Sequence, residues 1–159
     1  DPACPPQTAL RIRPAPRMMS LRARRSPPAI GENWMTRHVA GLVGSVMLLL
    51  SSVAHSVLGW PELRAPLEAL RAPEDLIAGL AIGWYFGGLA MLVFGLIAVD
   101  VFRRALRGEA VSLTAPLLIA VAYLAFGGWA IATTGDPFFM VFIVPGVLLG
   151  WASAPRGRA

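Results

Sequence analysis

Residues 76–99 read LIAGLAIGWYFGGLAMLVFGLIAV, an apolar run without a charged side chain. At about 1.5 Å per residue, such a run is long enough to cross a hydrocarbon core of roughly 30 Å as an α-helix. Pro73 is tolerated in the first turn of this helix, and Glu74 and Asp75 place negative charge at the positive end of the helix dipole. The segment therefore predicts a membrane-spanning helix over residues 76–99.

Three further uncharged apolar runs, at residues 39–59, 114–133 and 138–154, accompany this segment. The whole chain of 159 residues is 56% hydrophobic and only 14% charged, whereas roughly a quarter of the residues in a soluble domain are charged. A helix satisfies its own backbone hydrogen bonds, as lipid requires. We therefore predict an all-α fold over residues 35–159, an integral membrane four-helix bundle whose surface contacts the lipid bilayer.

Turn and capping residues separate the predicted spans. Ser112 or Thr114 is expected to cap the helix over residues 114–133. The run Thr-Gly-Asp-Pro at 134–137 offers a glycine after one helix and an N-cap aspartate with a first-turn proline for the next, so the last two spans are predicted to form a tight antiparallel hairpin. After Pro61, leucines at helical spacing alternate with charged residues, which predicts a short helix lying on the membrane surface.

Arginine-rich segments set the predicted orientation. Residues 1–34 are rich in arginine and proline without a helical or strand period, which predicts a disordered tail. Arginines also gather between the second and third runs and after the fourth, whereas acidic residues dominate the other connections. By the positive-inside rule, both termini are expected in the cytoplasm. The net charge of +5 is thereby explained by topology, and no nucleic-acid partner is predicted.

The basic residues are all arginine, and alanine, glycine and proline are abundant. This composition is typical of a GC-rich bacterial genome, so the expected location is a bacterial inner membrane. An alternative stays open for the first run: Arg37, the apolar stretch and the small residues before Ala54 resemble a cleavable signal peptide. Because the apolar stretch continues to Gly59, we prefer four spans to the three that a cut would leave.

Glycines at four-residue spacing mark the second span. Helices in lipid associate through close backbone approach, for which small residues four apart are typical. Gly79, Gly83 and Gly87 follow this spacing, and Gly95 lies two turns further along the same stripe. We interpret these glycines as contacts that hold the bundle together, with a dedicated interface to a second copy or a membrane partner as the alternative.

His55 is the one ionisable side chain well inside a predicted span, where such residues are costly and often functional. Counting along the helices places several polar and aromatic residues at similar depth. A ligand pocket in the outer half of the bundle is therefore a candidate, with His55, Ser52, Ser56, Trp84, Tyr85 and Trp129 as its members. The preferred alternative is a neutral histidine that bonds a serine or a carbonyl across helices.

Catalytic and metal-binding patterns are missing from the sequence. Cys4 is the single cysteine, and His38 lies at the opposite end of its helix from His55, so a zinc site with three or four ligands is not expected. A haem held by two intramembrane histidines is not expected either. No phosphate-binding loop or hydrolase motif is present. The sequence predicts no metal, no cofactor and no enzymatic activity.

The run His-Ser-Val-Leu-Gly at residues 55–59, followed by Leu63 and by Pro-Leu at residues 66–67, resembles a group of small, uncharacterised four-helix bacterial inner-membrane proteins. A Trp-His pair is common in the second helix of that group, and Trp84-Tyr85 is its counterpart here. Trp60 stands where an acidic residue is usual, and Tyr85 where a second histidine is usual. The resemblance implies a fold but no activity.

The sequence thus favours a non-enzymatic membrane protein that acts through helix packing with itself or with a partner. The alternative is transport or binding of a small molecule or a proton through the pocket around His55.

Overall fold

The computed structural model describes residues 32–155, and every regular element in that range is a helix. The elements are α1 (Glu32–Ala54), the π-helix η1 (His55–Gly59), α2 (Trp60–Ala69), α3 (Glu74–Leu106), α4 (Thr114–Thr134), the 3₁₀ helix η2 (Pro137–Phe139) and α5 (Met140–Ser153). The predicted all-α class is confirmed for these residues. Of the predicted tail, residues 1–31 lie outside the described residues, and residues 32–34 already belong to α1.

Three helices are long and apolar enough to cross a membrane: Asn33–Ala69, Glu74–Leu106 and Thr114–Thr134. The fourth apolar helix, Pro137–Ser153, is shorter. The run predicted at 114–133 coincides with α4, whereas α3 extends the run at 76–99 in both directions and includes charged residues in its last turn. The run at 138–154 corresponds to η2 and α5.

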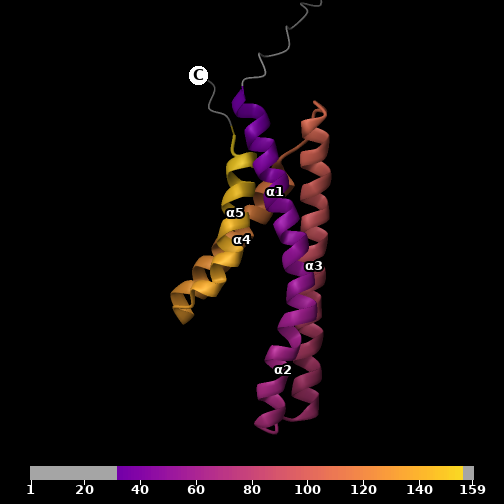
Figure 1. The fold of residues 1–159 in the computed structure, drawn as a ribbon, viewed down its shortest axis with the longest axis vertical. Coiled ribbons are helices and arrows are strands. Elements are labelled where there is room, and N and C mark those ends of the chain that lie inside the picture. Colours follow the sequence, from indigo (N-terminus) through magenta and orange to yellow (C-terminus); the bar gives the residue numbers. More distant parts are fainter. Residues whose placement is uncertain (1–31, 156–159) are drawn as a thin grey trace, which may run out of the picture.

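The first apolar run does not end before a separate surface helix, contrary to the prediction. α1, η1 and α2 follow one another without a break, and α2 continues in line with α1 (Figure 1). Pro61 is the second residue of α2 and does not end the continuous helix. A proline ring clashes with the carbonyl group four residues earlier, and the wider π-helical turn at His55–Gly59 lies at that place. We conclude that the local widening lets the helix pass the proline.

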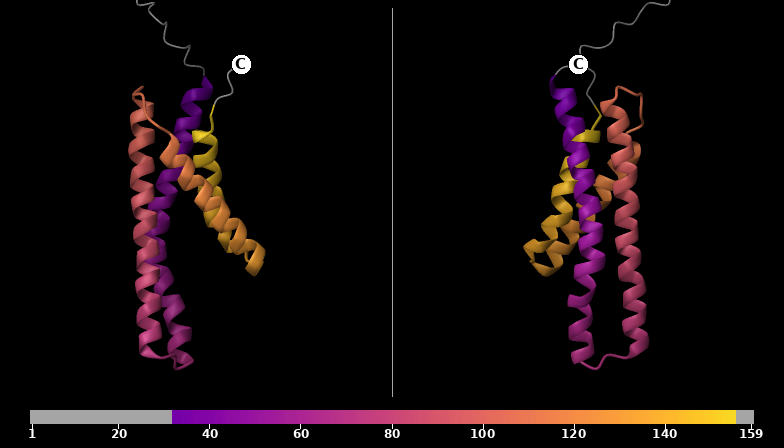
Figure 2. Two further views of the ribbon diagram at one scale, coloured as in Figure 1. Left: turned by 180° about the vertical axis from the view of Figure 1, so that it is seen from behind. Right: turned by 45° about the vertical axis from the view of Figure 1, so that its right-hand side comes forward.

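Two helical hairpins make up the molecule. α1–η1–α2 runs antiparallel to α3, and these two form a long pair (Figures 1 and 2). α4 and α5 form a second, shorter hairpin that meets the long pair at one end and diverges from it at the other (Figure 2). α5 packs against α1, while α3 and α4 touch only slightly. α1 therefore lies between α3 and α5.

The hairpin turn between α4 and α5 follows its sequence prediction. Gly135 has φ +70° and donates its N–H to Ile131 O at 2.8 Å, and Asp136 accepts a hydrogen bond from the Phe138 N–H at 2.8 Å. At the start of α4 the N-cap position is occupied by Leu113, which has no side-chain cap bond, and Thr114 is already the first residue of the helix. The Ser112 hydroxyl, one residue before the N-cap, accepts a hydrogen bond from the Thr114 N–H at 3.4 Å and donates one to Thr114 Oγ1 at 3.0 Å.

The core lies at the end of the molecule where α1 begins, α5 ends and α3 connects to α4, which we call the terminal end. Phe102 of α3 is fully buried there, and a Cβ at Gly41 of α1 would lie 2.5 Å from its ring. Leu48 and Leu149 are also fully buried in this cluster. The opposite end, at the α2–α3 turn, is the far end. The close packing of α1 on α3 and α5 also fixes the positions of His55 and Trp84, where η1 meets α3.

Candidate functional site

His55 and Trp84 bind each other where η1 crosses α3. The His55 Nε2 lies 3.1 Å from Trp84 O, and Trp84 Nε1 donates a hydrogen bond to His55 O at 2.7 Å. Their rings are stacked, with centroids 4.1 Å apart and planes within 7°. Because a carbonyl oxygen only accepts, the Nε2 of His55 carries the proton in this contact. The geometry is that of a histidine bonding a carbonyl across helices, which is the contact that we preferred from the sequence.

The two predicted serines, Ser52 and Ser56, contact α3 beside the His55–Trp84 pair. Ser52 lies about one turn before His55 in the chain, and Ser56 directly follows it. Ser52 is buried and donates its hydroxyl to Gly88 O at 2.8 Å. Ser56 packs so closely on Gly88 that a Cβ at this glycine would collide with the serine hydroxyl. Ser52, His55 and Trp84 thus join α1–η1 to α3 through side chains bonded to backbone carbonyls, and Ser56 adds close packing.

The glycines of α3 divide into two sets. A Cβ at Gly95 would lie 2.6 Å from Leu49, and one at Gly87 would lie 3.4 Å from the His55 ring, so these two glycines face the first helix. No atom lies within 4 Å of the Cβ position at Gly79 or Gly83. The predicted glycine stripe does not include Gly88, although Gly88 has the closest contact of the α3 glycines. Gly88 lies seven residues, or two helical turns, before Gly95, and this spacing could have placed it on the same face.

Tyr85 and Trp129 lie apart from His55. Tyr85 is half exposed, and its ring lies 6.1 Å from that of Trp60 on α2. Trp129 is 62% exposed on α4, with its ring near Phe126. The cavity beside His55 is lined by Phe138, Val141 and Phe142 of η2 and α5 and not by Trp129 or Tyr85. The structure thus brings together His55, Ser52, Ser56 and Trp84 and leaves the other two candidates outside.

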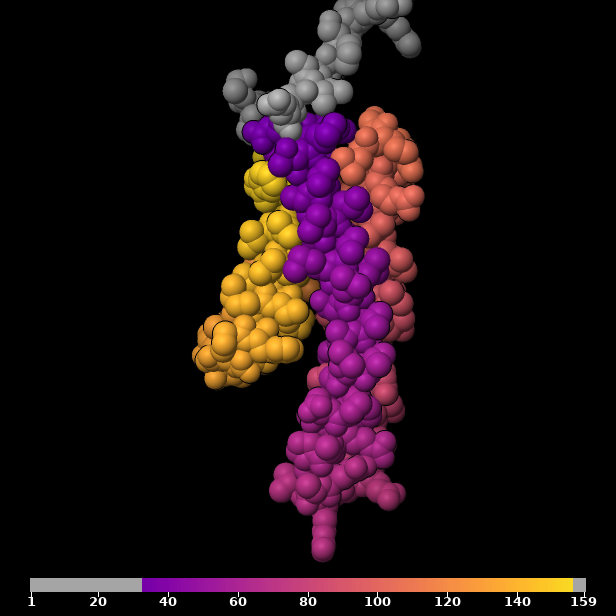
Figure 3. Space-filling view, viewed as in Figure 1, coloured from indigo at the N-terminus to yellow at the C-terminus, as the bar shows by residue number. Residues whose placement is uncertain are grey.

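A cavity of about 550 Å³ opens beside His55, between the long pair and the start of α5. We call it the His55 cleft, and Figure 3 shows the hollow between the hairpin and the α1–α2 rod in which it lies. Its lining is mostly apolar, with His55 and Glu62 as its ionisable members: Ser51, Ala54, His55, Leu58, Gly59, Glu62, Leu63, Trp84, Met91, Phe138, Val141 and Phe142. Such an apolar cavity with a few polar groups is typical of a ligand site.

Glu62 was missed by the sequence analysis because the helix was expected to stop at Pro61. In a continuous helix, a residue seven positions after His55 lies two turns along the same face. Among the described residues Glu62 makes no ion pair. Its carboxylate is therefore available to a group that enters the cleft.

Metal chemistry has no support in the described part of the chain, because no three of its His, Cys, Asp and Glu side chains gather in one place. No protein-family model matches the chain, and no curated protein or solved structure matches it. Side chains bonded to carbonyls across helices, an open glycine face on α3 and the apolar His55 cleft are the structural features that point to a function.

Proposed function

We propose that this chain is an integral membrane protein that crosses the cytoplasmic membrane of a bacterium four times and acts by assembling with a second copy of itself through α3. Three of its helices have the length and apolar composition needed for crossing. The fourth, Pro137–Ser153, forms a tight hairpin with α4 and so returns to the side from which α4 came. An even number of crossings puts both termini on one side.

The charges support an orientation with the terminal end in the cytoplasm. Arg37 of α1 and the arginines of the last turn of α3, Arg103 and Arg104, lie at the terminal end. The far end carries Glu62 and Glu74 at the starts of its helices, and Arg64 there is paired with Glu68 at 2.7 Å. Arginine on the cytoplasmic flank is the usual bias of bacterial membrane proteins.

Helix α1 supports an uncleaved first span, because it packs against both α3 and α5. A cut after Ala54 would remove the helix that joins the two hairpins. The bonds from Ser52 and His55 to α3 would be lost or divided by the same cut. We therefore expect the mature protein to retain α1.

The observation that carries the assembly proposal is the open glycine face of α3. Gly79 and Gly83 are one turn apart, and nothing lies near their Cβ positions. The large side chains beside them, Ile82 and Phe86, are about 70% exposed. A pair of glycines four residues apart on a lipid-exposed face permits close approach of a second helix. A second copy is the simplest occupant, because an α3–α3 contact is symmetric and symmetric dimers are the commonest assemblies.

Substitution of Gly83 by leucine tests this proposal. A Cβ at Gly83 has no neighbouring side chain or other helix within 4 Å, so the monomer should fold normally while the two α3 helices are held apart. Gly128→Leu is the matched control, since Gly128 of α4 has equally open surroundings. In a lipid bilayer, single-molecule photobleaching or cysteine crosslinking should show dimers for the wild type and for Gly128→Leu, and monomers for Gly83→Leu. Dimers of unchanged abundance in Gly83→Leu, or monomers in the wild type, would refute assembly through this face.

A second function, binding of an elongated apolar molecule, is favoured by the His55 cleft. The cleft is apolar along its length and has Glu62 and His55 in its wall. An alkyl chain that ends in a hydroxyl or ammonium group matches this combination, because the carboxylate of Glu62 accepts hydrogen bonds from either.

A fluorescent long-chain alkylamine is the probe for this second function, with a fatty acid of equal length as the charge control. Ala54→Trp should fill the cleft and abolish binding of the amine, because Ala54 lines the cavity. Val53→Trp, at the neighbouring exposed position, should leave binding unchanged. Equal binding by both variants would show that the probe enters the detergent or lipid and not the cleft.

A further inference from the structure

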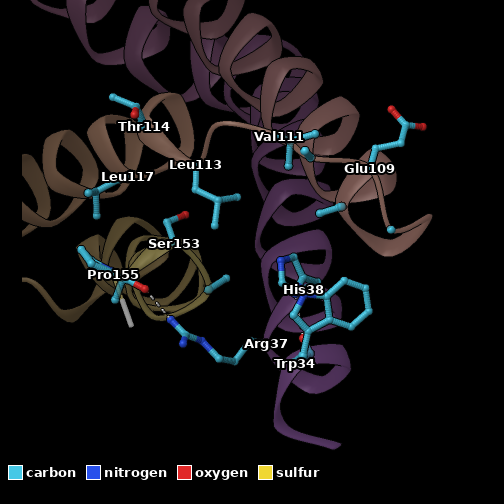
Figure 4. A pocket seen from close by; sticks show the side chains of 15 residues that line it. Trp34, Arg37, His38, Glu109, Val111, Leu113, Thr114, Leu117, Ser153 and Pro155 are labelled. Atoms are coloured by element: carbon cyan, nitrogen blue, oxygen red, sulfur yellow. Dashed lines mark hydrogen bonds between the residues drawn. The ribbon is translucent and has the colours of Figure 1, made fainter. Parts of the chain in front are cut away.

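A second cavity, of about 630 Å³, lies at the terminal end among four helix ends (Figure 4). Its walls come from the first turns of α1, the end of α3 with the link to α4, the first turn of α4 and the last turn of α5. We call it the terminal pocket. The polar or aromatic residues of its lining that matter here are Trp34, Arg37, His38, Glu109, Thr114 and Ser153.

Ser153 brings an unsatisfied hydroxyl to this pocket. Ser153 is only 5% exposed, and its Oγ has no hydrogen-bond partner among the described residues. Figure 4 shows the hydroxyl leaving α5 on the side of Leu113, another residue of the lining. A buried hydroxyl without a partner is unfavourable, since it has lost water and gained nothing in return. A ligand with a donor or acceptor would satisfy it.

His38 is the second buried polar group of the lining, at 7% exposure. Its Nδ1 lies 2.7 Å from Trp34 O, which can only accept, so this nitrogen carries the proton. In the neutral ring the Nε2 is then an acceptor. The ring is held beside Trp34, with centroids 4.7 Å apart, and edge-on to Phe102 at 6.2 Å. Such a fixed acceptor suits a ligand that offers a hydroxyl group.

Positive charge prevails around the terminal pocket. Arg37 donates from Nε and Nη2 to Trp151 O and from Nη2 to Ala154 O, so its charge caps the end of α5 without meeting a carboxylate among the described residues. Glu109 is itself bonded by two arginines of the α3 end, at 2.7 and 2.9 Å. The start of α4 adds the positive end of a helix dipole, and no acidic residue lies in its first turn. An anionic group is therefore favoured at this place.

We propose that the terminal pocket binds a phosphate ester that also carries hydroxyl groups, as the headgroup of phosphatidylglycerol does. The anion is attracted by Arg37 and the start of α4, and the hydroxyl groups match Ser153 and His38. The apolar stretch of α1 begins directly after His38, so in the proposed orientation the pocket lies at the depth of lipid headgroups. A water-soluble ester such as glycerol 3-phosphate has the same chemistry. This site does not depend on assembly through α3.

The test titrates the full chain in detergent with short-chain phosphatidylglycerol, with phosphatidylcholine of equal chain length and with glycerol 3-phosphate. Ser153→Ala should weaken binding of the glycerol-bearing ligand about tenfold, the effect of one hydrogen bond to a charged ligand. His38→Phe, which keeps a ring but no nitrogen, should weaken it similarly. The matched control is Ser45→Ala, because Ser45 is equally buried but its hydroxyl is satisfied by Gly41 O at 2.7 Å.

The outcomes answer two separate questions: whether the terminal pocket binds a phosphate ester, and whether that ester is a lipid headgroup or a soluble molecule. Binding of phosphatidylglycerol alone identifies a lipid headgroup, and equal binding of glycerol 3-phosphate identifies a soluble ester. Either result supports the proposal if Ser153→Ala weakens binding and Ser45→Ala does not. Equal affinity for phosphatidylcholine, no binding of any probe, or wild-type affinity in both Ser153→Ala and His38→Phe overturns it.

Discussion

Single side chains bonded to backbone carbonyls hold the long pair together. Ser52 and His55 each reach a carbonyl of α3, and Trp84 returns a bond to His55 O. Helices in lipid gain little from burying apolar surface against each other, because lipid is as apolar as leucine. Polar contacts and close packing therefore determine which faces of these helices meet. His55 has a structural role in this contact whether or not the cleft beside it takes a ligand.

Replacement of Trp84 by phenylalanine should lower the free energy of unfolding by about 1 kcal/mol, the usual size of an interhelical hydrogen bond in a membrane protein. The ring stack on His55 is largely retained, but His55 O loses its partner. Trp129→Phe makes the same chemical change at an exposed position and should have little effect. Reversible unfolding by SDS in mixed micelles measures both. A loss for Trp129→Phe as large as that for Trp84→Phe would contradict the structural role of this contact.

Glu109 makes the link between α3 and α4 sensitive to pH. The side chains of Arg104 and Arg107 donate hydrogen bonds that lower its pKa below the usual value of a glutamate. A carboxyl whose folded-state pKa is depressed stabilises the fold above its unfolded pKa of about 4.3 and ceases to do so as the pH falls through the lowered value. Wild type should thus be more stable than Glu109→Gln at pH 7, and the difference should vanish in acid. Because Glu109 is exposed, salt should reduce the difference; identical stability at pH 7 and low salt would refute the effect.

Among the elements, α3 has two unlike faces, and η1 sets the register of α2. One face of α3 has its glycines pressed against α1, and the other exposes Gly79 and Gly83. The π-helix adds a wider turn between α1 and α2, as π-helical turns inside α-helices commonly do at functional sites. Trp60 at the start of α2 is thereby buried near Trp84.

Deletion of Val57, an exposed residue of η1, should convert the π-helical turn to an α-helical one and leave the register of α2 nearly unchanged, because four residues of α-helix turn the chain about as far as five of π-helix. The face of α2 that includes Arg64 lies across a shared cavity from Ala78 of α3. In a Cys4→Ser background, a cysteine pair at these two positions should therefore crosslink both in the full chain and in this variant. Deletion of Val53 from the regular turns of α1 should instead rotate α2 by about 100° and abolish the crosslink. Efficient crosslinking after deletion of Val53, or its loss after deletion of Val57, would show that η1 does not set the register.

At the scale of the whole molecule, the long pair exceeds what a bilayer requires. The 37 residues from Asn33 to Ala69 span about 55 Å, against roughly 30 Å of hydrocarbon. The apolar stretch of this helix ends near Trp60, and charged residues begin at Glu62. The end of α2 and the first turn of α3 at Glu74 are thus expected to project beyond the hydrocarbon at the far end.

Cysteine labelling in whole cells tests this placement. A cysteine at Leu70, which is 81% exposed at the tip of the far end, should react with a membrane-impermeant maleimide added from outside, once the outer membrane is opened. A cysteine at Gly108, in the link at the terminal end, should react only after the inner membrane is broken. The reverse pattern would invert the proposed orientation. Labelling of both sites while the inner membrane is intact would contradict their placement on opposite sides of the bilayer.

The apolar runs and the turn residues predict where the helices lie in the sequence, but they do not predict how the helices are arranged in space. Each of the four runs is helical, and Gly135 and Asp136 form the predicted turn, because both follow from local chemistry. Whether Pro61 would end a helix depended on a π-helical turn that no residue pattern announces. Glu62 lines the His55 cleft because the helix continues past Pro61, and Trp129 lies outside the cleft because of the angle between the two hairpins, which is set by packing between segments distant in the sequence.

The position of α1 between α3 and α5 also bears on how the protein is made. Its contact with α3 is available once the first hairpin has left the ribosome, but its contact with α5 awaits the last helical residues of the chain. If the chain is inserted into a membrane as proposed, the second hairpin is therefore expected to dock sideways on a surface of α1 that forms first. The machinery that releases the first pair into lipid would then have to leave that flank of α1 uncovered until α5 arrives.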